Sequence, residues 1–221
     1  SVGFGILLPQ LPLLIARLLG AGGTPVQVSR ATGFMSAIYM LALFVAAPVW
    51  GRVSDRRGRR PVLLVGLAGF GATMIGFGFF ETLTAVYVER ALSGLFAAAV
   101  TPVALAAVTD ITASRDVLGR RLTFVSLAGV SGFLLGPTFG LALMGGGAGG
   151  LALPLRATGG LALVAALAVA LTLRPTPAPT PGTGARRRGP AAGTVVRLLA
   201  LAFVVSAGVA VFEVALALRG Q

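Results

Sequence analysis

The sequence predicts an all-α fold: a polytopic bundle of membrane-spanning helices. Its mean hydropathy is +0.94, and 56% of its residues are hydrophobic against 11% charged, proportions far from those of soluble domains. The apolar residues form runs of about 20, the length that a helix needs to cross a hydrocarbon core about 30 Å thick. Short polar connections separate these runs, as loops at the membrane surface would.

The first half of the bundle is expected to contain three spans. The first covers residues 2–19 and includes Pro9, which membrane helices tolerate when neighbours satisfy the freed carbonyl. The second, residues 31–50, ends at Trp50, a residue type enriched at the membrane interface. The third, residues 61–80, opens with a proline in its first turn, where the missing N–H needs no partner.

Three further spans complete this bundle. A two-residue connection precedes the fourth, residues 83–108, so the third and fourth spans should pack as an antiparallel pair. A polar stretch, residues 109–121, leads to the fifth span, residues 122–144. A glycine-rich turn then leads to the sixth, residues 151–173.

The chain is expected to divide at a linker. Residues 1–173 form the six-helix bundle, and residues 174–193, rich in proline, glycine and arginine, form a disordered cytoplasmic linker. Residues 194–221 then hold a seventh span, residues 194–218, the first helix of a second bundle. The chain opens and stops within apolar runs, which we interpret as a fragment of a longer protein.

The arginines fix the expected orientation. The segment GRVSDRRGRR, residues 51–60, lies between two apolar runs, and the positive-inside rule places it in the cytoplasm. With alternating topology most other arginines fall on that side too. The opposite side receives Arg17, Arg30, Arg156 and Arg219. We therefore interpret the net charge of +12 as a topology signal with anionic membrane lipids as counter-charge, not as nucleic-acid binding.

Several kinds of chemistry are not expected. The chain has no histidine and no cysteine, which removes the commonest general base and every thiolate metal site. Its few carboxylates are scattered along the chain. We therefore expect no enzyme, no metal site and no cofactor.

Four segments, in order, resemble signatures of the major facilitator superfamily. Residues 51–60 resemble its loop between the second and third helices, and residues 3–13, GFGILLPQLPL, resemble the first helix of its drug-efflux branch. Residues 89–94, ERALSG, resemble its fourth-helix signature. Residues 132–140, GFLLGPTFG, resemble its fifth-helix antiporter signature, although Leu141 stands where a final glycine is common. Members typically have twelve helices in two six-helix halves.

The resemblance implies a multi-pass protein of the inner (plasma) membrane that exports lipophilic, drug-like small molecules by alternating access. The weight of Ala, Gly, Pro and Arg in the composition is typical of a GC-rich bacterial coding sequence. Protons would be the coupling ion. One alternative is a facilitator or symporter of a small metabolite such as a sugar or an amino acid. A multi-span receptor or membrane-bound enzyme would need a ligand domain or a catalytic constellation, and we find neither in this sequence.

The resemblance also assigns a cytoplasmic gate. Asp55 and Arg59 are four residues apart and could pair on a short helical turn. The family pattern adds Asp110, so that the three form a charge cluster latching the cytoplasmic side in the outward-facing state and contacting a helix of the second half. The alternative is a solvated loop whose charges only set topology. The other residues of this gating motif are Gly51, Arg56, Gly58 and Arg60.

Embedded charges are the proton-relay candidates. Arg90 lies about 10 Å inside the fourth span, where it could belong to a relay or could snorkel to the interface. Glu89 projects about 100° away around the helix, so we do not expect the two to need each other as partners. Glu213, near the outer end of the seventh span, is the other candidate.

Small and polar residues complete the expected site. Gly132, Gly136 and Gly140 recur every fourth residue and form a smooth strip for a neighbouring backbone, with Pro137 expected to bend the helix. By resemblance this strip serves antiport, and ordinary close packing is the alternative. The substrate-cavity candidates are Gln10, Pro9 and Gly94, with Gln10 equally able to bond a neighbouring helix.

Overall fold

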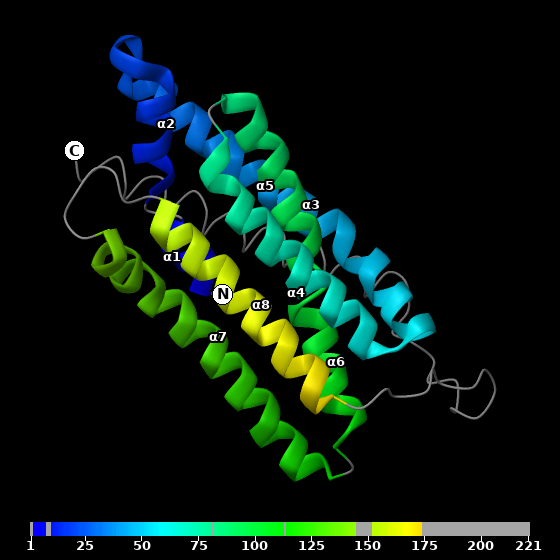
Figure 1. The fold of residues 1–221 in the computed structure, drawn as a ribbon. Coiled ribbons are helices and arrows are strands. Elements are labelled where there is room, and N and C mark those ends of the chain that lie inside the picture. Colours follow the sequence, from blue (N-terminus) through cyan, green and yellow to red (C-terminus); the bar gives the residue numbers. More distant parts are fainter. Residues whose placement is uncertain (1, 8–9, 81, 113, 145–151, 174–221) are drawn as a thin grey trace. The chain divides into compact units, whose positions relative to one another are not determined.

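The computed structural model describes residues 2–173 except 8–9, 81, 113 and 145–151 (Figure 1). The chain divides into two units, Ser1–Ala178 and Pro179–Gln221, and the described residues belong to the first. The predicted linker and seventh span lie outside the described residues. The described part is all-α, as predicted. Its elements are α1 (Val2–Leu7), α2 (Leu11–Leu19), η2 (Gly20–Gly22), α3 (Pro25–Arg57), α4 (Arg59–Gly76), η3 (Phe77–Phe79), α5 (Leu83–Ala97), α6 (Thr101–Asp110), α7 (Arg115–Met144) and α8 (Ala152–Thr172).

Four segments of the described part are long and apolar enough to cross a membrane: Pro25–Arg57, Leu83–Asp110, Arg115–Gly140 and Leu153–Thr172. They correspond to the second, fourth, fifth and sixth predicted spans. The first predicted span is divided into α1 and α2, both short. The third is α4, whose two leading arginines lower its mean hydropathy.

The arginine-rich segment is mostly helical, which corrects the prediction of a polar loop. Helix α3 runs through it to Arg57, and α4 begins at Arg59. Only Gly58 separates them, with φ +92°, a backbone conformation that favours glycine, and its N–H donates to the carbonyl oxygen of Ser54 (3.0 Å). Arginine is a good helix former, so polarity marks the edge of the membrane without ending the helix.

Two other boundaries differ from prediction for related reasons. Helix α7 begins at Arg115 instead of residue 122, which shortens the expected polar loop to residues 111–114. Helix α3 begins at Pro25 instead of residue 31. There Thr24 and Gln27 form a reciprocal capping box, in which each side chain accepts a hydrogen bond from the other's backbone N–H (3.3 and 3.0 Å). Both helices therefore extend beyond their apolar runs.

The fourth predicted span is interrupted between α5 and α6. The N–H of Ala99 donates to the carbonyl oxygen of Phe96, a tighter bond than the α-helical one, and the carbonyl oxygen of Leu95 loses its helical partner. Pro102 follows in the first turn of α6. Because proline has no backbone N–H, it cannot donate a hydrogen bond back across the break. The span therefore consists of two helices joined by a turn.

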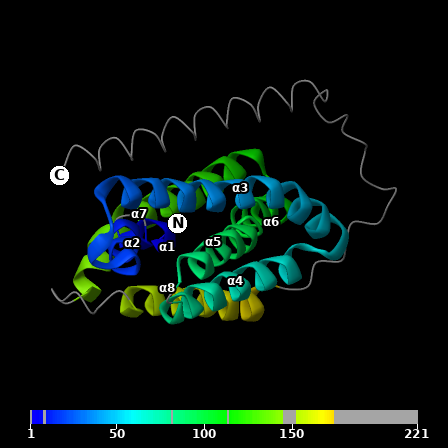
Figure 2. The same ribbon diagram turned by 90° about the horizontal axis from the view of Figure 1, so that it is seen from above.

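The helices pack in pairs that are far apart in the sequence. Helix α1 pairs with α7, α3 with α5, and α4 with α8, and both views show α4 and α8 side by side (Figures 1 and 2). In terms of spans, the pairs are one with five, two with four, and three with six. If spans one, two and three exchange places with spans four, five and six, the same three pairs result. This symmetry is expected of an internal structural repeat. Helix α4 also contacts α5, which confirms the predicted neighbours.

Glycines allow the helices of these pairs to approach backbone to backbone, as α4 with α8 and α3 with α5 illustrate. A Cβ atom added to Gly71 of α4 would lie 3.0 Å from the carbonyl oxygen of Gly159 of α8, and the reverse distance is 2.7 Å. A Cβ added to Gly94 of α5 would lie 2.5 Å from the carbonyl oxygen of Tyr39 of α3. Small residues at such crossings supply the close packing on which membrane helices depend.

Candidate functional site

Arg59 holds two carboxylates from different helices at the arginine-rich end of the bundle. Its Nη1 lies 2.5 Å from Oδ1 of Asp55, in the last turn of α3, and its Nε donates to Oδ2 of Asp110, the last residue of α6, at 2.9 Å. Nη1 also donates to Oγ of Ser54 (2.7 Å). The three charged residues that the sequence grouped therefore meet in the structure, although Asp55 and Arg59 lie on two helices separated by Gly58.

The cluster is electrostatically tight but exposed to water. Burial lowers the pKa of Arg59, but hydrogen bonds with Asp110 and Asp55, and the charges of both, outweigh burial and raise that pKa above its usual value. Arg59 therefore stays charged at every physiological pH. The side chains of Asp55 and Asp110 are 64% and 44% exposed, and such pairs contribute only about 0–1 kcal/mol each to stability. An interaction of this strength can form and break during a conformational change.

The other residues of the gating motif surround this cluster. Gly51 and Arg56 lie on α3, Arg56 on its exposed surface, and Gly58 forms the break between the helices. Arg60 reaches another element, because its Nη2 donates to the carbonyl oxygen of Ala170 in the last turn of α8 (2.7 Å). That contact supplies a partner for a carbonyl at a helix end, and it could not be predicted from the sequence because the two residues lie far apart along the chain.

Glu89 and Arg90 form an ion pair inside the bundle, which corrects the expectation that they need not interact. The side chains are 1% and 2% exposed. Arg90 Nε donates to Glu89 Oε2 at 2.7 Å, and Nη2 lies 2.7 Å from the same oxygen. The angular offset between neighbouring positions is outweighed by the length of the arginine side chain and by the cost of leaving two buried charges apart. Because Arg90 is enclosed, it does not snorkel to the surface.

Two aromatic rings complete the surroundings of Arg90. Its Cζ lies 4.8 Å from the ring centroid of Phe77 on η3 and 5.8 Å from that of Tyr39 on α3, both within cation–π range. The second carboxylate oxygen of Glu89, Oε1, has no hydrogen-bond partner among the described residues. Tyr39 and Phe77 could not be identified from the sequence, because a single aromatic residue in an apolar run carries no signal that separates a cation's partner from ordinary packing.

The glycine strip of α7 is buried, and Gly136 and Gly140 of this strip lie against α1. Gly132, Gly136 and Gly140 are all buried. A Cβ added to Gly136 would lie 2.7–2.8 Å from backbone atoms of Gly5 and Ile6. The predicted smooth face therefore does receive a neighbouring backbone, while its part in antiport stays a prediction. Helix α7 runs through Pro137 without interruption.

The substrate-cavity candidates lie in different surroundings. Gln10, at the N-terminus of α2, is buried beside Gly140, and neither atom of its amide has a hydrogen-bond partner among the described residues. Neither the cavity role of Gln10 nor its alternative, a bond to a neighbouring helix, is decided by these contacts, and both stay predictions. Gly94 lies in the crossing of α3 and α5. Pro9 and the relay candidate Glu213 lie outside the described residues.

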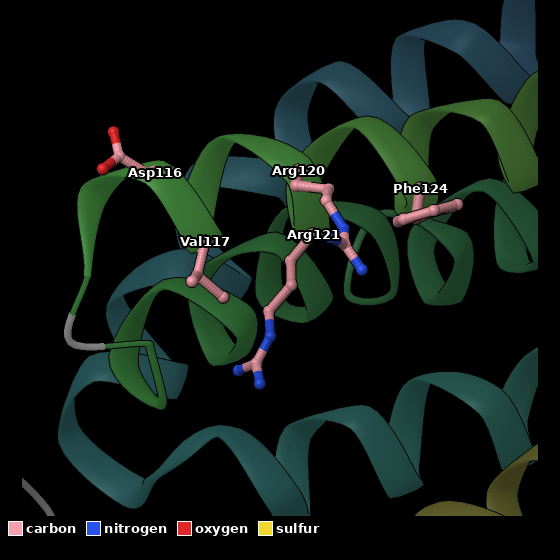
Figure 3. A pocket seen from close by; sticks show the side chains of 5 residues that line it. All are labelled: Asp116, Val117, Arg120, Arg121 and Phe124. Atoms are coloured by element: carbon pink, nitrogen blue, oxygen red, sulfur yellow. The ribbon is translucent and has the colours of Figure 1, made fainter.

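A shallow hollow lies beside the first turns of α7 (Figure 3). Arg121 Nη1 donates to Oγ1 of Thr112 at 3.0 Å, and Arg120 lies 6.0 Å from the ring centroid of Phe124. Figure 3 shows the carboxylate of Asp116 pointing away from both arginines. The hollow therefore presents positive charge beside apolar surface at the expected cytoplasmic face. Its lining residues are Asp116, Val117, Arg120, Arg121 and Phe124.

The chain shares sequence with known bacterial proteins. The chain is 30% identical over 139 residues to multidrug resistance protein 1 of Bacillus subtilis (strain 168), covering 63% of this chain and 34% of that protein. It is 31% identical over 143 residues to tetracycline resistance protein, class B, of Escherichia coli, covering 63% and 33%. Multidrug resistance protein 2 of the same Bacillus strain is 28% identical over 166 residues, covering 75% and 39%. The chain thus spans about a third of the length of these relatives.

The family model of the Major Facilitator Superfamily matches residues 1–219, nearly the whole chain. Together with the apolar helices and the bacterial relatives, this match places the chain in the inner membrane as a multi-pass protein. The order of motifs, the paired helices and the family match lead to one assignment. The chain belongs to the major facilitator superfamily.

Proposed function

We propose that the full-length protein exports lipophilic, drug-like small molecules by alternating access, driven by the re-entry of protons. The family assignment and relatives named for multidrug and tetracycline resistance support export of small molecules. The geometry supports the finer claim of proton coupling, and one observation carries it: the enclosed pair of Glu89 and Arg90.

The pair has the properties that coupling requires. An arginine at the centre of a membrane helix costs about 2.5–3.5 kcal/mol on insertion scales, so its presence in a span calls for a function. The carboxylate of Glu89 can accept a proton, which changes the net charge of the pair from zero to +1. The pair touches α3 and η3 as well as α5, so that a change in charge acts on the packing of three elements.

The Arg59 cluster supplies the gate in this proposal. It joins α3, α4 and α6 on the expected cytoplasmic side, and its exposed charges interact weakly enough to separate when that side opens. A contact between this cluster and a helix of the second half remains part of the proposal.

The crossing of α1 and α7 offers a smooth surface for relative movement. Gly5 and Gly136 present backbone to backbone, and Gln10 lies beside Gly140 at the next turn. We propose that Gln10 and the adjacent Pro9 of the first span, together with Gly94 of the fourth, border the substrate passage, and that Glu213 is a second proton-binding candidate. Anionic lipid headgroups would lie against the positively charged hollow of α7.

The alternative of a facilitator or symporter for a small polar metabolite is less well supported. Such a substrate requires several polar groups in the interior. The buried polar and charged side chains of the described part are Gln10, Ser54, Glu89, Arg90, Ser93 and Thr158. Ser54 belongs to the Arg59 cluster, and Ser93 and Thr158 donate to backbone carbonyls of their own helices.

Transport of ethidium into inverted proteoliposomes that contain the full-length protein tests the proposal. We expect an imposed proton gradient to drive accumulation in the wild type. Glu89→Gln should abolish gradient-driven accumulation but retain exchange of ethidium between the two sides. Asp116→Asn removes an exposed carboxylate and serves as the matched control, which should behave as the wild type. Accumulation that ignores the gradient in the wild type, or that persists in Glu89→Gln, would overturn the proposal.

A further inference from the structure

We propose that Phe77 and Tyr39 are positioning residues that hold the Arg90 guanidinium in place while Glu89 carries the coupling proton. This inference rests on the proposed function. It assigns the two rings the role of replacing the carboxylate as the partner of a buried cation.

The geometry encloses the guanidinium on several sides. Nε and Nη2 of Arg90 both contact Oε2 of Glu89. The ring of Phe77 approaches Cζ to 4.8 Å, and that of Tyr39 to 5.8 Å. The three partners come from α5, η3 and α3, so the cation lies where these elements meet. Cation–π attraction is strongest where water is excluded, and Arg90 is 2% exposed.

Protonation removes the only carboxylate that the described residues place on Arg90. The other described acidic residues, Asp55, Asp110 and Asp116, lie at the arginine-rich end of the bundle. Arg59 and Phe77 are separated by the whole of α4, about 27 Å for a helix of that length. No other described carboxylate can therefore take the place of Glu89, and a buried guanidinium without a partner is strongly disfavoured.

No other charged group among the described residues faces the pair. Tyr39 is its titratable neighbour from α3, and η3 contributes only Phe77. The arginines of α4 lie at its far end. Arg17 of α2 and Arg156 of α8 are exposed, and Arg156 lies 5.4 Å from the ring of Phe79. The response of the pair to pH is therefore set by Glu89, Arg90, the two rings and the neighbouring hydroxyl of Ser93.

The proton has a defined place on the carboxylate. Oε1 of Glu89 has no hydrogen-bond partner in the described structure, whereas Oε2 contacts Arg90. A proton that reaches the site adds to Oε1, and the pair changes from neutral to singly positive. The rings are neutral in both states, and their faces attract the cation in both. In the ion pair the carboxylate charge of Glu89 already stabilises the guanidinium, whereas in the protonated state that charge is gone. The rings therefore lower the free energy of the protonated state more than that of the ion pair.

The pH dependence of gradient-driven ethidium transport by the full-length protein tests this inference. Phe77→Leu removes one ring, and we expect the midpoint of the pH profile to fall by about one unit, a roughly tenfold loss of proton affinity. Tyr39→Leu should shift the midpoint in the same direction. Phe77→Tyr and Tyr39→Phe retain the rings and should retain the wild-type midpoint. Phe77 and Tyr39 lie on different elements. If one leucine variant fails to fold, the other variant still tests the inference.

Phe79→Leu is the matched control, because Phe79 lies two residues from Phe77 but faces the exposed Arg156. An unchanged midpoint in the folded leucine variants at positions 77 and 39, or an equal shift in Phe79→Leu, overturns the inference. The proposed function fails separately. Wild-type transport that ignores the proton gradient, or coupled transport by Glu89→Gln, refutes coupling through Glu89. Coupled wild-type transport with an uncoupled Glu89→Gln and unshifted ring variants refutes only the role of the rings.

Discussion

The indole Nε1 of Trp50 on α3 donates a hydrogen bond to the carbonyl oxygen of Leu95 on α5, across 2.8 Å. This carbonyl has lost its helical partner because the N–H of Ala99 bonds to Phe96 instead. Trp50 therefore supplies a backbone partner at the break between α5 and α6. Helix α6 carries Asp110 to Arg59, so the same break sets the position of one member of the charge cluster.

Replacing Trp50 should destabilise this junction. Trp50→Phe keeps an aromatic ring but removes the donor, and a neutral hydrogen bond contributes about 0.5–1.5 kcal/mol to stability. We expect a lower midpoint in thermal unfolding of the purified protein in detergent. Phe34→Leu, an exposed position on the same helix, is the control and should change little. A Trp50→Phe variant as stable as the wild type would show that the bond contributes nothing.

The crossing of α1 and α7 should not accept a side chain at Gly136. Even Gly136→Ala would place a Cβ 2.7–2.8 Å from the backbone of α1, and overpacking of this kind costs about 1–3 kcal/mol. We expect lower thermal stability and slower transport, with Gly136→Leu more severe. Gly119→Ala on the same helix has open space and is the control. Normal folding and unchanged transport in Gly136→Leu would remove any special role for this position.

The charge cluster should matter for transport more than for stability. Asp55→Asn removes one partner of Arg59, and because Asp55 is 64% exposed we expect a loss of at most about 1 kcal/mol. Membrane insertion should be normal while the rate of transport falls severely. The raised pKa of Arg59 means that its stabilising charge is lost only well above physiological pH, so this cluster's cation adds no step to the pH profile between pH 6 and 9. Full transport activity in Asp55→Asn would refute the latch.

Labelling from the two sides of the membrane should reveal the orientation. The chain has no cysteine, so Arg57→Cys and Gly22→Cys introduce unique thiols within it, both at exposed positions. We expect an impermeant maleimide to label Gly22→Cys in intact cells and Arg57→Cys only in inverted vesicles. Labelling of Arg57→Cys in intact cells would reverse the topology on which the gate is based.

Much of the architecture could be predicted from the sequence, because burial in lipid requires long apolar runs and orientation requires asymmetric arginines. The spacing of Gly132, Gly136 and Gly140 indicated a close crossing before its partner was known. The family signature indicated that Asp55, Arg59 and Asp110 would meet. In these cases the constraint lies in the local sequence or in a motif with few structural solutions.

The remaining features depend on contacts between distant segments. Composition cannot show that α3 and α7 continue as helices through polar residues, because polarity reports contact with water and not the end of a helix. The pairing of Glu89 with Arg90 depends on the absence of water around both, which follows only from the packed bundle. Tyr39, Phe77 and the partners of Trp50 and Arg60 come from other helices, so no local pattern could have identified them.

Proton release on substrate binding is the measurement that tests the central claim most directly. Ethidium is added to the full-length protein in weakly buffered detergent solution near the midpoint of its transport profile, and the pH is followed. If substrate and proton exclude each other through Glu89, the wild type acidifies the solution and Glu89→Gln does not, although it still binds ethidium. Equal acidification by both proteins, or none by a wild type that binds ethidium, would contradict coupling through the Glu89 and Arg90 pair.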